Sequence, residues 1–230
     1  EGHRFLQQAR EHRRGHLAVG RGMGLRNRLP QRPQTLALVG RDQVHLRELE
    51  EGQALLHRAL DHLALVRVVQ RGQLDLLARY DARASFFCIG KNVKTWPAVY
   101  ERILREGHIV GNHTMNHRNG WKSSDEEYFA DIGEAAKYID SKLFRPPYGR
   151  LTRFQGKGLQ KAGYEMIMWT VLSGDFDAKK SAAQCWDMVR ENVDNGSIIV
   201  YHDSEKAWDR LNVVLPQTLE WFSARGYIFE

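Results

Sequence analysis

The chain has 230 residues, a net charge of +6 and two cysteines. This length suits one large domain or two small ones with a substantial core. Two cysteines exclude a disulfide framework, and no stretch approaches the roughly 18 apolar residues of a membrane-spanning helix. Arg21 interrupts the apolar run at 16–25, so we expect no signal peptide in the chain as given.

All of the excess charge lies in the first third of the chain. Residues 1–72 hold 13 arginines, no lysine and 7 acidic residues, whereas residues 73–230 are neutral. The first segment also lacks Ile, Ser, Trp, Tyr and Cys, and a folded domain rarely lacks so many residue types at once. Three interpretations stay open for it: an Arg-rich helical or disordered segment, a nucleic-acid-binding arm, or a stretch read out of frame or from a misassigned start. We favour the third.

Strands and helices alternate from residue 73 to the end. In chain order, we predict a strand at 84–89, a helix at 91–105, a strand at 108–111, a helix from 123–126 to 143, a strand at 144–147, a helix at 152–163, a strand at 164–171, a helix at 181–193, a strand at 197–201, a helix at 207–224 and a strand at 227–229. The strands are apolar throughout and the connections are short, which is typical of parallel strands that are buried on both faces. The sequence therefore predicts an α/β fold.

Polar residues follow several of these strands directly. His113 and His117 follow one strand, and two imidazoles four residues apart can bind one metal ion if the segment between them turns once like a helix. Arg145, Asp175 and His202 follow later strands. Since carboxyl ends of barrel strands meet at one mouth, we expect metal-assisted hydrolysis there. A zinc protease is excluded because position 114 is Thr rather than Glu.

Five motifs in order make residues from about 74 onwards resemble the polysaccharide deacetylase family (NodB homology, carbohydrate esterase 4). They read Ser85-Phe86-Phe87-Cys88-Ile89-Gly90, His113-Thr114-Met115-Asn116-His117, Arg145-Pro146-Pro147-Tyr148-Gly149, the region 169–176, and Ser197-Ile198-Ile199-Val200-Tyr201-His202-Asp203. The resemblance covers about two thirds of the chain. It implies a distorted (β/α) barrel, here incomplete at its N-terminal strand, in a domain at 73–230.

The resemblance also implies a hydrolase that removes acetyl groups from a polysaccharide or amino sugar, most often an N-acetylglucosamine polymer. A divalent metal ion, usually Zn²⁺, would be held by His113 and His117. His202 would be the general acid, and Arg145 would orient the catalytic base. The backbone N–H of Tyr148 would help to bind the oxyanion. Pro147, Val200 and Asp175 are assigned to substrate binding.

The chain departs from the family pattern in two motifs. Leu172 and Phe176 stand where the fourth motif often has aspartate and tryptophan. The family also has an N-terminal motif that is not among these five. It contains two adjacent aspartates, the base and the third metal ligand, and should fall near residues 60–65. No such pair occurs in residues 1–82, and Asp61 and His62 lack a strand and turn context. We therefore hypothesise that the reading frame is lost upstream of about residue 73.

Two alternatives to an active deacetylase remain. One is a catalytically impaired relative that lacks the aspartate pair. The other is nucleic-acid binding by the basic segment 1–72, although its only aromatic residue is Phe5 and the folded part is neutral. We expect an acetylated polysaccharide or oligosaccharide as partner, no nucleic acid and no membrane span; the sequence does not give the oligomeric state. Trp121 and Trp169 are assigned to the core or the rim rather than to sugar binding.

Overall fold

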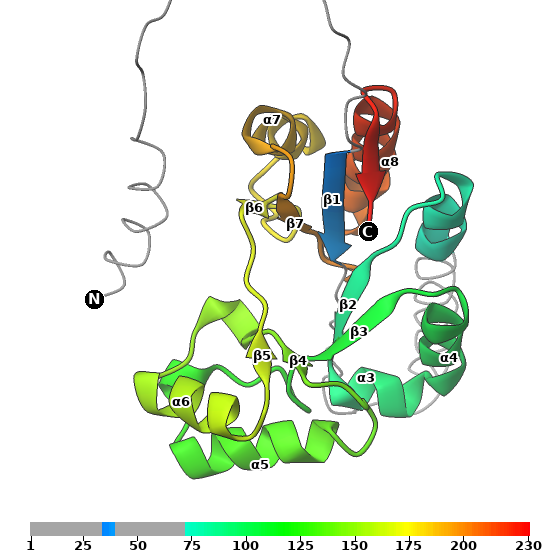
Figure 1. The fold of residues 1–230 in the computed structure, drawn as a ribbon. Helices are drawn as coiled ribbons and strands as arrows, with labels where there is room; N and C mark the ends of the chain where they lie inside the picture. Colours follow the sequence, from blue (N-terminus) through cyan, green and yellow to red (C-terminus); the bar gives the residue numbers. More distant parts are fainter. Residues whose placement is uncertain (1–33, 40–71) are drawn as a thin grey trace, which may run out of the picture. The chain divides into compact units, whose positions relative to one another are not determined.

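The computed structural model describes residues 34–39 and 72–230, and it is an α/β structure with parallel strand pairs (Figure 1). The strands are β1 (Gln34–Val39), β2 (Ser85–Cys88), β3 (Ile109–Asn112), β4 (Leu143–Phe144), β5 (Glu165–Met166), β6 (Val171–Leu172), β7 (Ile198–Val200) and β8 (Tyr227–Phe229). They form two four-stranded sheets, in the orders β6-β7-β1-β8 and β2-β3-β4-β5.

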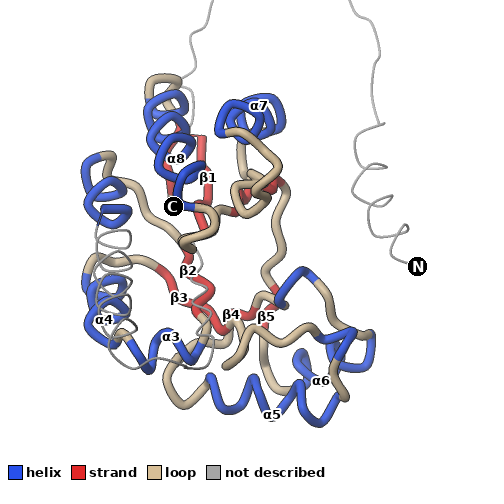
Figure 2. Tube along the Cα trace, turned by 180° about the vertical axis from the view of Figure 1, so that it is seen from behind, coloured by secondary structure: helices blue, strands red, loops and turns tan. Residues whose placement is uncertain are grey.

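Helices connect the strands. Residues 72–79 are helical and precede β2. The other helical segments are α3 (Gly90–Thr95), α4 (Pro97–Arg105), η1 (Gly120–Lys122), α5 (Asp125–Ala135), η2 (Pro147–Gly149), α6 (Arg153–Lys161), α7 (Ala182–Asn192) and α8 (Trp208–Ser223). Helices α7 and α8 pack together, as do α5 and α6 (Figure 2). None of the described helices is long and apolar enough to cross a bilayer.

Strand β1 comes from the N-terminal side of the predicted domain boundary at residue 73. It pairs in parallel with β7, where Ala37 is opposite Ile198, and with β8, where Gln34 is opposite Tyr227. The sequence predicted a barrel that is incomplete at its N-terminal strand. In the structure, residues 34–39 supply a strand between β7 and β8. The predicted boundary at residue 73 falls within the helix at 72–79, whereas the expected aspartate motif near 60–65 lies outside the described residues.

The predicted helix at 91–105 is wrong as a single helix. The structure divides it into α3 and α4 at Trp96, which has φ −127° and ψ 57°. Trp96 precedes Pro97, and the proline ring disfavours helical geometry in the residue before it. Pro97 then begins α4, a position where its missing N–H costs no helical hydrogen bond.

Helix starts follow the sequence more closely than helix ends. Ser124, Thr152 and Ser181 each cap a helix in a reciprocal capping box with the glutamate or glutamine three residues later. Helix α5, however, ends at Ala135 rather than near residue 143. Residues 136–142 form turns and a loop that lead into β4. Capping chemistry is local, whereas the point where a helix leaves the core depends on tertiary packing.

The predicted strand at 164–171 is also wrong as one element. Its two ends belong to different sheets: β5 pairs with β4, and β6 pairs with β7. Between them the Ile167 N–H still bonds to the Phe144 carbonyl at 2.9 Å, whereas the Thr170 N–H bonds to the Ile198 carbonyl at 3.1 Å. The chain thus crosses from one sheet to the other within residues 167–170.

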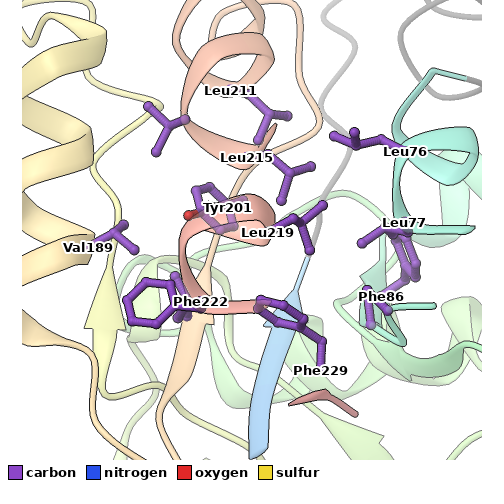
Figure 3. Close-up of a cluster of buried hydrophobic side chains, with 14 of the residues drawn as sticks. Leu76, Leu77, Phe86, Val189, Tyr201, Leu211, Leu215, Leu219, Phe222 and Phe229 are labelled. Carbon is purple, nitrogen blue, oxygen red and sulfur yellow. The ribbon is translucent and has the colours of Figure 1, made fainter. Parts of the chain in front are cut away.

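The largest described hydrophobic cluster lies between α8, α7, the helix at 72–79 and the neighbouring strands (Figure 3). Helix α8 contributes a single apolar face at helical spacing: Leu211, Leu215, Leu219 and Phe222. Tyr201 reaches this cluster from the end of β7, and its hydroxyl bonds to the hydroxyl of Thr218. Burial raises the pKa of Tyr201 far above its ordinary value, so the phenol stays neutral.

Buried His108 makes the stability of the fold depend on pH. The Ala84 N–H donates to His108 Nδ1 at 3.3 Å, and the Phe86 ring lies 5.3 Å from the imidazole. Burial is the main cause that lowers the pKa of His108 below 6.5, with Glu106 opposing it and Arg83 and Arg102 adding to it. The unfolded chain therefore binds the proton more readily than the folded chain.

We predict that the free energy of unfolding falls as pH drops below about 6.5, because protonation of His108 favours the unfolded state. The His108→Asn variant keeps an acceptor but does not titrate. Its free energy of unfolding should change less between pH 7.5 and pH 5.0 than that of the wild type, as measured by urea denaturation. Equal pH dependence in both proteins would contradict this assignment.

Candidate active site

A cavity of about 370 Å³ lies at the carboxyl ends of the parallel strands. Its described lining comes from both sheets: Phe87, His113, His117, Arg145, Pro146, Tyr148, Gly149, Arg150, Trp169, Leu172, Phe176, Val200, Tyr201 and His202. Six of the eight residues predicted for the site are among them. Asp175 and Pro147 do not line the cavity. Asp175 is hydrogen-bonded to His202, which does. Pro147 is buried, and its neighbour Pro146 lines the cavity instead.

His113 and His117 converge on one wall of this cavity. Their ring centroids lie 5.2 Å apart, and the residues are 1% and 7% exposed. The predicted helical turn between the two histidines is wrong. Residues 113–117 form an irregular loop, in which Thr114 and His117 have positive φ values of 66° and 57°. The loop, rather than a helix face, brings the imidazoles together.

Hydrogen bonds from two sides hold this histidine loop. The N–H groups of Gly90 and Lys91, at the start of α3, bond to the carbonyls of Thr114 and Met115. On the other side, buried Asp131 of α5 accepts from the Asn116 N–H at 2.9 Å and from the Asn116 side chain at 2.7 Å. The loop is therefore positioned by two helices that do not themselves line the cavity.

The tautomer of His113 follows from its neighbour. His113 Nδ1 lies 2.5 Å from the backbone carbonyl oxygen of Arg145. A carbonyl only accepts, so Nδ1 carries the proton and Nε2 presents its lone pair. This is the usual arrangement of a metal-binding histidine, whose second nitrogen is fixed by a backbone carbonyl or carboxylate.

Arg145 is buried and its guanidinium binds backbone carbonyls. Nε donates to Ile167 at 2.8 Å and Nη2 to Met168 at 2.7 Å. The guanidinium carbon also lies 4.2 Å from the ring centroid of Phe87. The side chain thus binds the segment that connects β5 to β6, and it also lines the cavity. The base that Arg145 was predicted to orient is not among the described residues that line the cavity.

The turn after β4 places Tyr148 at the mouth of the cavity. Tyr148 has φ 60°, is 55% exposed, and its ring centroid lies 4.5 Å from that of His117. Gly149 follows with φ 68°, and a Cβ there would lie 2.7 Å from the Trp169 ring. Three of the four described non-glycine residues with positive φ, Thr114, His117 and Tyr148, therefore lie in this site, where backbone strain often accompanies function.

His202 lines the cavity after β7 and forms a hydrogen-bonded pair with Asp175. Asp175 is completely buried and accepts from His202 twice, from the backbone N–H and from Nδ1, each at 2.7 Å. Phe176 packs its ring against the imidazole, with centroids 4.9 Å apart. Asp175, which the sequence assigned to substrate binding, sits where it fixes the orientation of His202.

Two of the described residues could hold a metal ion. His113 and His117 have the donor type that zinc prefers, and the tautomer of His113 fits ligation. Within residues 34–39 and 72–230, however, no group of three His, Cys, Asp or Glu side chains is placed to hold a metal ion. A third protein ligand is therefore not found in this part of the chain.

Comparison with known proteins gives the class. The family model described as polysaccharide deacetylase matches residues 66–167. A peptidoglycan-N-acetylglucosamine deacetylase of Bacillus cereus is 34% identical over 162 residues, which are 68% of this chain and 76% of the relative. A chitooligosaccharide deacetylase of Azorhizobium caulinodans is 30% identical and matches 56% of this chain and 64% of its own length. Some relatives are much longer, since the match covers 34% of one from Listeria monocytogenes.

The fold agrees. The structure of the peptidoglycan deacetylase PdaC from Bacillus subtilis matches with a TM-score of 0.67 and 22% identity, over 86% of this chain and 87% of that one. The chain belongs to the polysaccharide deacetylase family, a family of enzymes, and the expected NodB-type α/β fold is confirmed. In the described residues the strands form two sheets rather than one closed ladder.

Two residues of the site were not predicted from the sequence: Asp131, the anchor of the histidine loop, and Arg150 at the rim of the cavity. Arg150 directly follows the third motif, so proximity to a motif was a usable signal. Asp131 lies 15 residues from Asn116, and only the tertiary structure joins them. Of the two tryptophans assigned to core or rim, Trp169 lines the cavity and Trp121 is 63% exposed.

We predict that Asp131→Ala lowers the free energy of unfolding by about 1–3 kcal/mol, because it removes charge-assisted hydrogen bonds at a buried site. Glu134→Gln on the same helix is the matched control. It breaks an exposed pair with Lys137 and should cost much less. Urea denaturation measures both, and equal losses would show that Asp131 does not anchor the loop.

Proposed function

We propose that this site hydrolyses acetyl groups from an N-acetylglucosamine polymer, with a divalent metal ion, zinc, bound by His113 and His117. The proposal rests on one observation, that His113, His117 and His202 line the same cavity. Two buried imidazoles line it after β3, and a histidine fixed by a buried carboxylate lines it after β7. A cavity of about 370 Å³ is within the range of small-ligand sites.

His202 supplies the proton for the leaving group in this proposal. Asp175 occupies Nδ1, so Nε2 is the ring nitrogen available to the cavity. The carboxylate accepts from Nδ1 and prevents the ring from turning. Nε2 can then donate its proton to the sugar nitrogen as the bond to the acetyl carbon breaks.

Other residues shape the place of the acetyl group. Tyr148 has an unusual backbone conformation at the mouth of the cavity, and its N–H is the proposed donor to the oxyanion. Val200 and Leu172 give an apolar wall that suits a methyl group. A zinc ion, when bound, would polarise the acetyl carbonyl as a Lewis acid.

A catalytically impaired relative is the second candidate. It is favoured by one observation, that residues 1–82 contain no pair of adjacent aspartates. Such a chain would keep two metal ligands and the general acid but lack the base. On this ground we expect weak zinc binding and slow turnover from the chain as given.

We predict that the full chain binds zinc weakly and that His113→Ala or His117→Ala weakens binding at least about tenfold further, since each removes a ligand. Isothermal titration calorimetry with zinc measures the affinity. His108→Asn, which changes a buried histidine outside the cavity, should bind as the wild type does. Unchanged affinity in both alanine variants would contradict the assigned ligands.

We also predict that acetate release from an N-acetylglucosamine tetramer, with added zinc, is slow and that Asp175→Asn lowers kcat by about a hundredfold with little change in KM. The variant replaces the charged acceptor that orients His202. Asp177→Asn, two residues away, is the control and should keep the wild-type rate. Wild-type turnover as fast as that of a relative with both aspartates would refute the hypothesis that this chain is catalytically impaired. A fully active Asp175→Asn variant would refute the proposed role of the His202–Asp175 pair.

A further inference from the structure

We propose that Trp121 and Arg150 form a second sugar subsite at the rim of the cavity, which binds a neighbouring pyranose ring that carries a carboxylate. The proposal rests on the proposed function, because it names the sugar beside the one that loses its acetyl group. Neither residue belongs to the metal pair or to the His202–Asp175 pair. Both come from connecting segments next to the site, around η1 and after η2.

Trp121 is an exposed indole that is held in place. The residue is 63% exposed, although tryptophan is normally largely buried. Its backbone N–H bonds to the Asn119 side chain at 3.0 Å, and its ring Nε1 donates to the Leu151 carbonyl at 2.9 Å. The polar edge of the ring is therefore satisfied by the protein, while the apolar surface faces solvent.

The backbone on either side fixes where this indole lies. The Gly120 N–H bonds to the Arg150 carbonyl at 3.2 Å. A Cβ on Gly120 would lie 2.5 Å from Gln155 Oε1 and 2.8 Å from the Arg150 carbonyl oxygen. Only glycine allows this close approach. The segment that bears Trp121 is thus pressed against the segment that follows the third motif.

Arg150 links Trp121 to the cavity. Its side chain is exposed and lines the cavity, and its guanidinium carbon lies 5.0 Å from the centroid of the Trp121 ring. No carboxylate pairs with Arg150 among residues 34–39 and 72–230. The described lining contains two arginines and three histidines but no aspartate or glutamate. Positive charge at this rim is therefore available to an acidic ligand.

The two side chains match two parts of one ligand. A flat aromatic face suits the C–H face of a pyranose, in the same way that it accommodates other amphipathic rings. A guanidinium binds a carboxylate through two parallel hydrogen bonds. A neutral N-acetylglucosamine oligomer offers only the first contact, whereas a glycan with an acidic sugar next to the acetylated one offers both.

The test compares two tetrasaccharides with the full chain by isothermal titration calorimetry. One is a neutral N-acetylglucosamine tetramer, and the other alternates N-acetylglucosamine with its 3-O-lactyl, carboxylate-bearing form. We expect the acidic glycan to bind about tenfold tighter, with an affinity that falls as salt is raised. Trp121→Ala should weaken both glycans about tenfold. Arg150→Gln should weaken only the acidic glycan and remove its salt dependence.

A similar tryptophan–arginine pair on another surface provides the control. Trp221 and Arg225 stack with 3.3 Å from guanidinium carbon to ring centroid, and neither lines the cavity. Trp221→Ala and Arg225→Gln should bind both glycans as the wild type does. The subsite is refuted if Trp121→Ala or Arg150→Gln binds as the wild type does, or if the wild type binds neither glycan. Glycan binding without acetate release would instead refute the proposed function and leave the subsite standing.

Discussion

The buried guanidinium of Arg145 ties together the strand ends on which the site depends. The backbone N–H of Arg145 donates to the carbonyl of Asn112 at the end of β3, and the side chain donates to the carbonyls of Ile167 and Met168 between β5 and β6. The Arg145 carbonyl accepts a hydrogen bond from His113 Nδ1. A buried charge is costly unless it is well solvated by such groups. The carbonyls and the Phe87 ring therefore have to be held close to it, and this requirement fixes the wall of the cavity.

The other functional groups are positioned by similar means. The histidine loop is anchored by Asp131 and by the first amides of α3, and His202 is anchored by Asp175. In each case the group that faces the cavity is held by a buried partner behind it. The contacts of the histidine loop hold the unusual backbone at Thr114 and His117, and Tyr148 has a positive φ at the same site, which agrees with the tendency of strain to gather at functional sites.

The sequence predicts the parts of this arrangement that depend on local chemistry. The alternation of strands and helices, the caps at Ser124, Thr152 and Ser181, and the polar residues after the strands are all visible in the chain. The break at Trp96 was also readable, because a proline follows. The division of 164–171 between two sheets was not, since it depends on Arg145, more than twenty residues away. The pairing of His202 with Asp175 is likewise a contact across 27 residues.

The proposed function depends most on one assignment, that His113 and His117 form the metal-binding wall of the cavity. It is tested most directly by the anomalous scattering of zinc in a crystal of the full chain grown with zinc at neutral pH. We expect a zinc ion about 2.0–2.1 Å from Nε2 of both histidines, at the cavity that His202 faces. Zinc bound elsewhere, or a crystal in which both imidazoles bind no metal at saturating zinc, would contradict it.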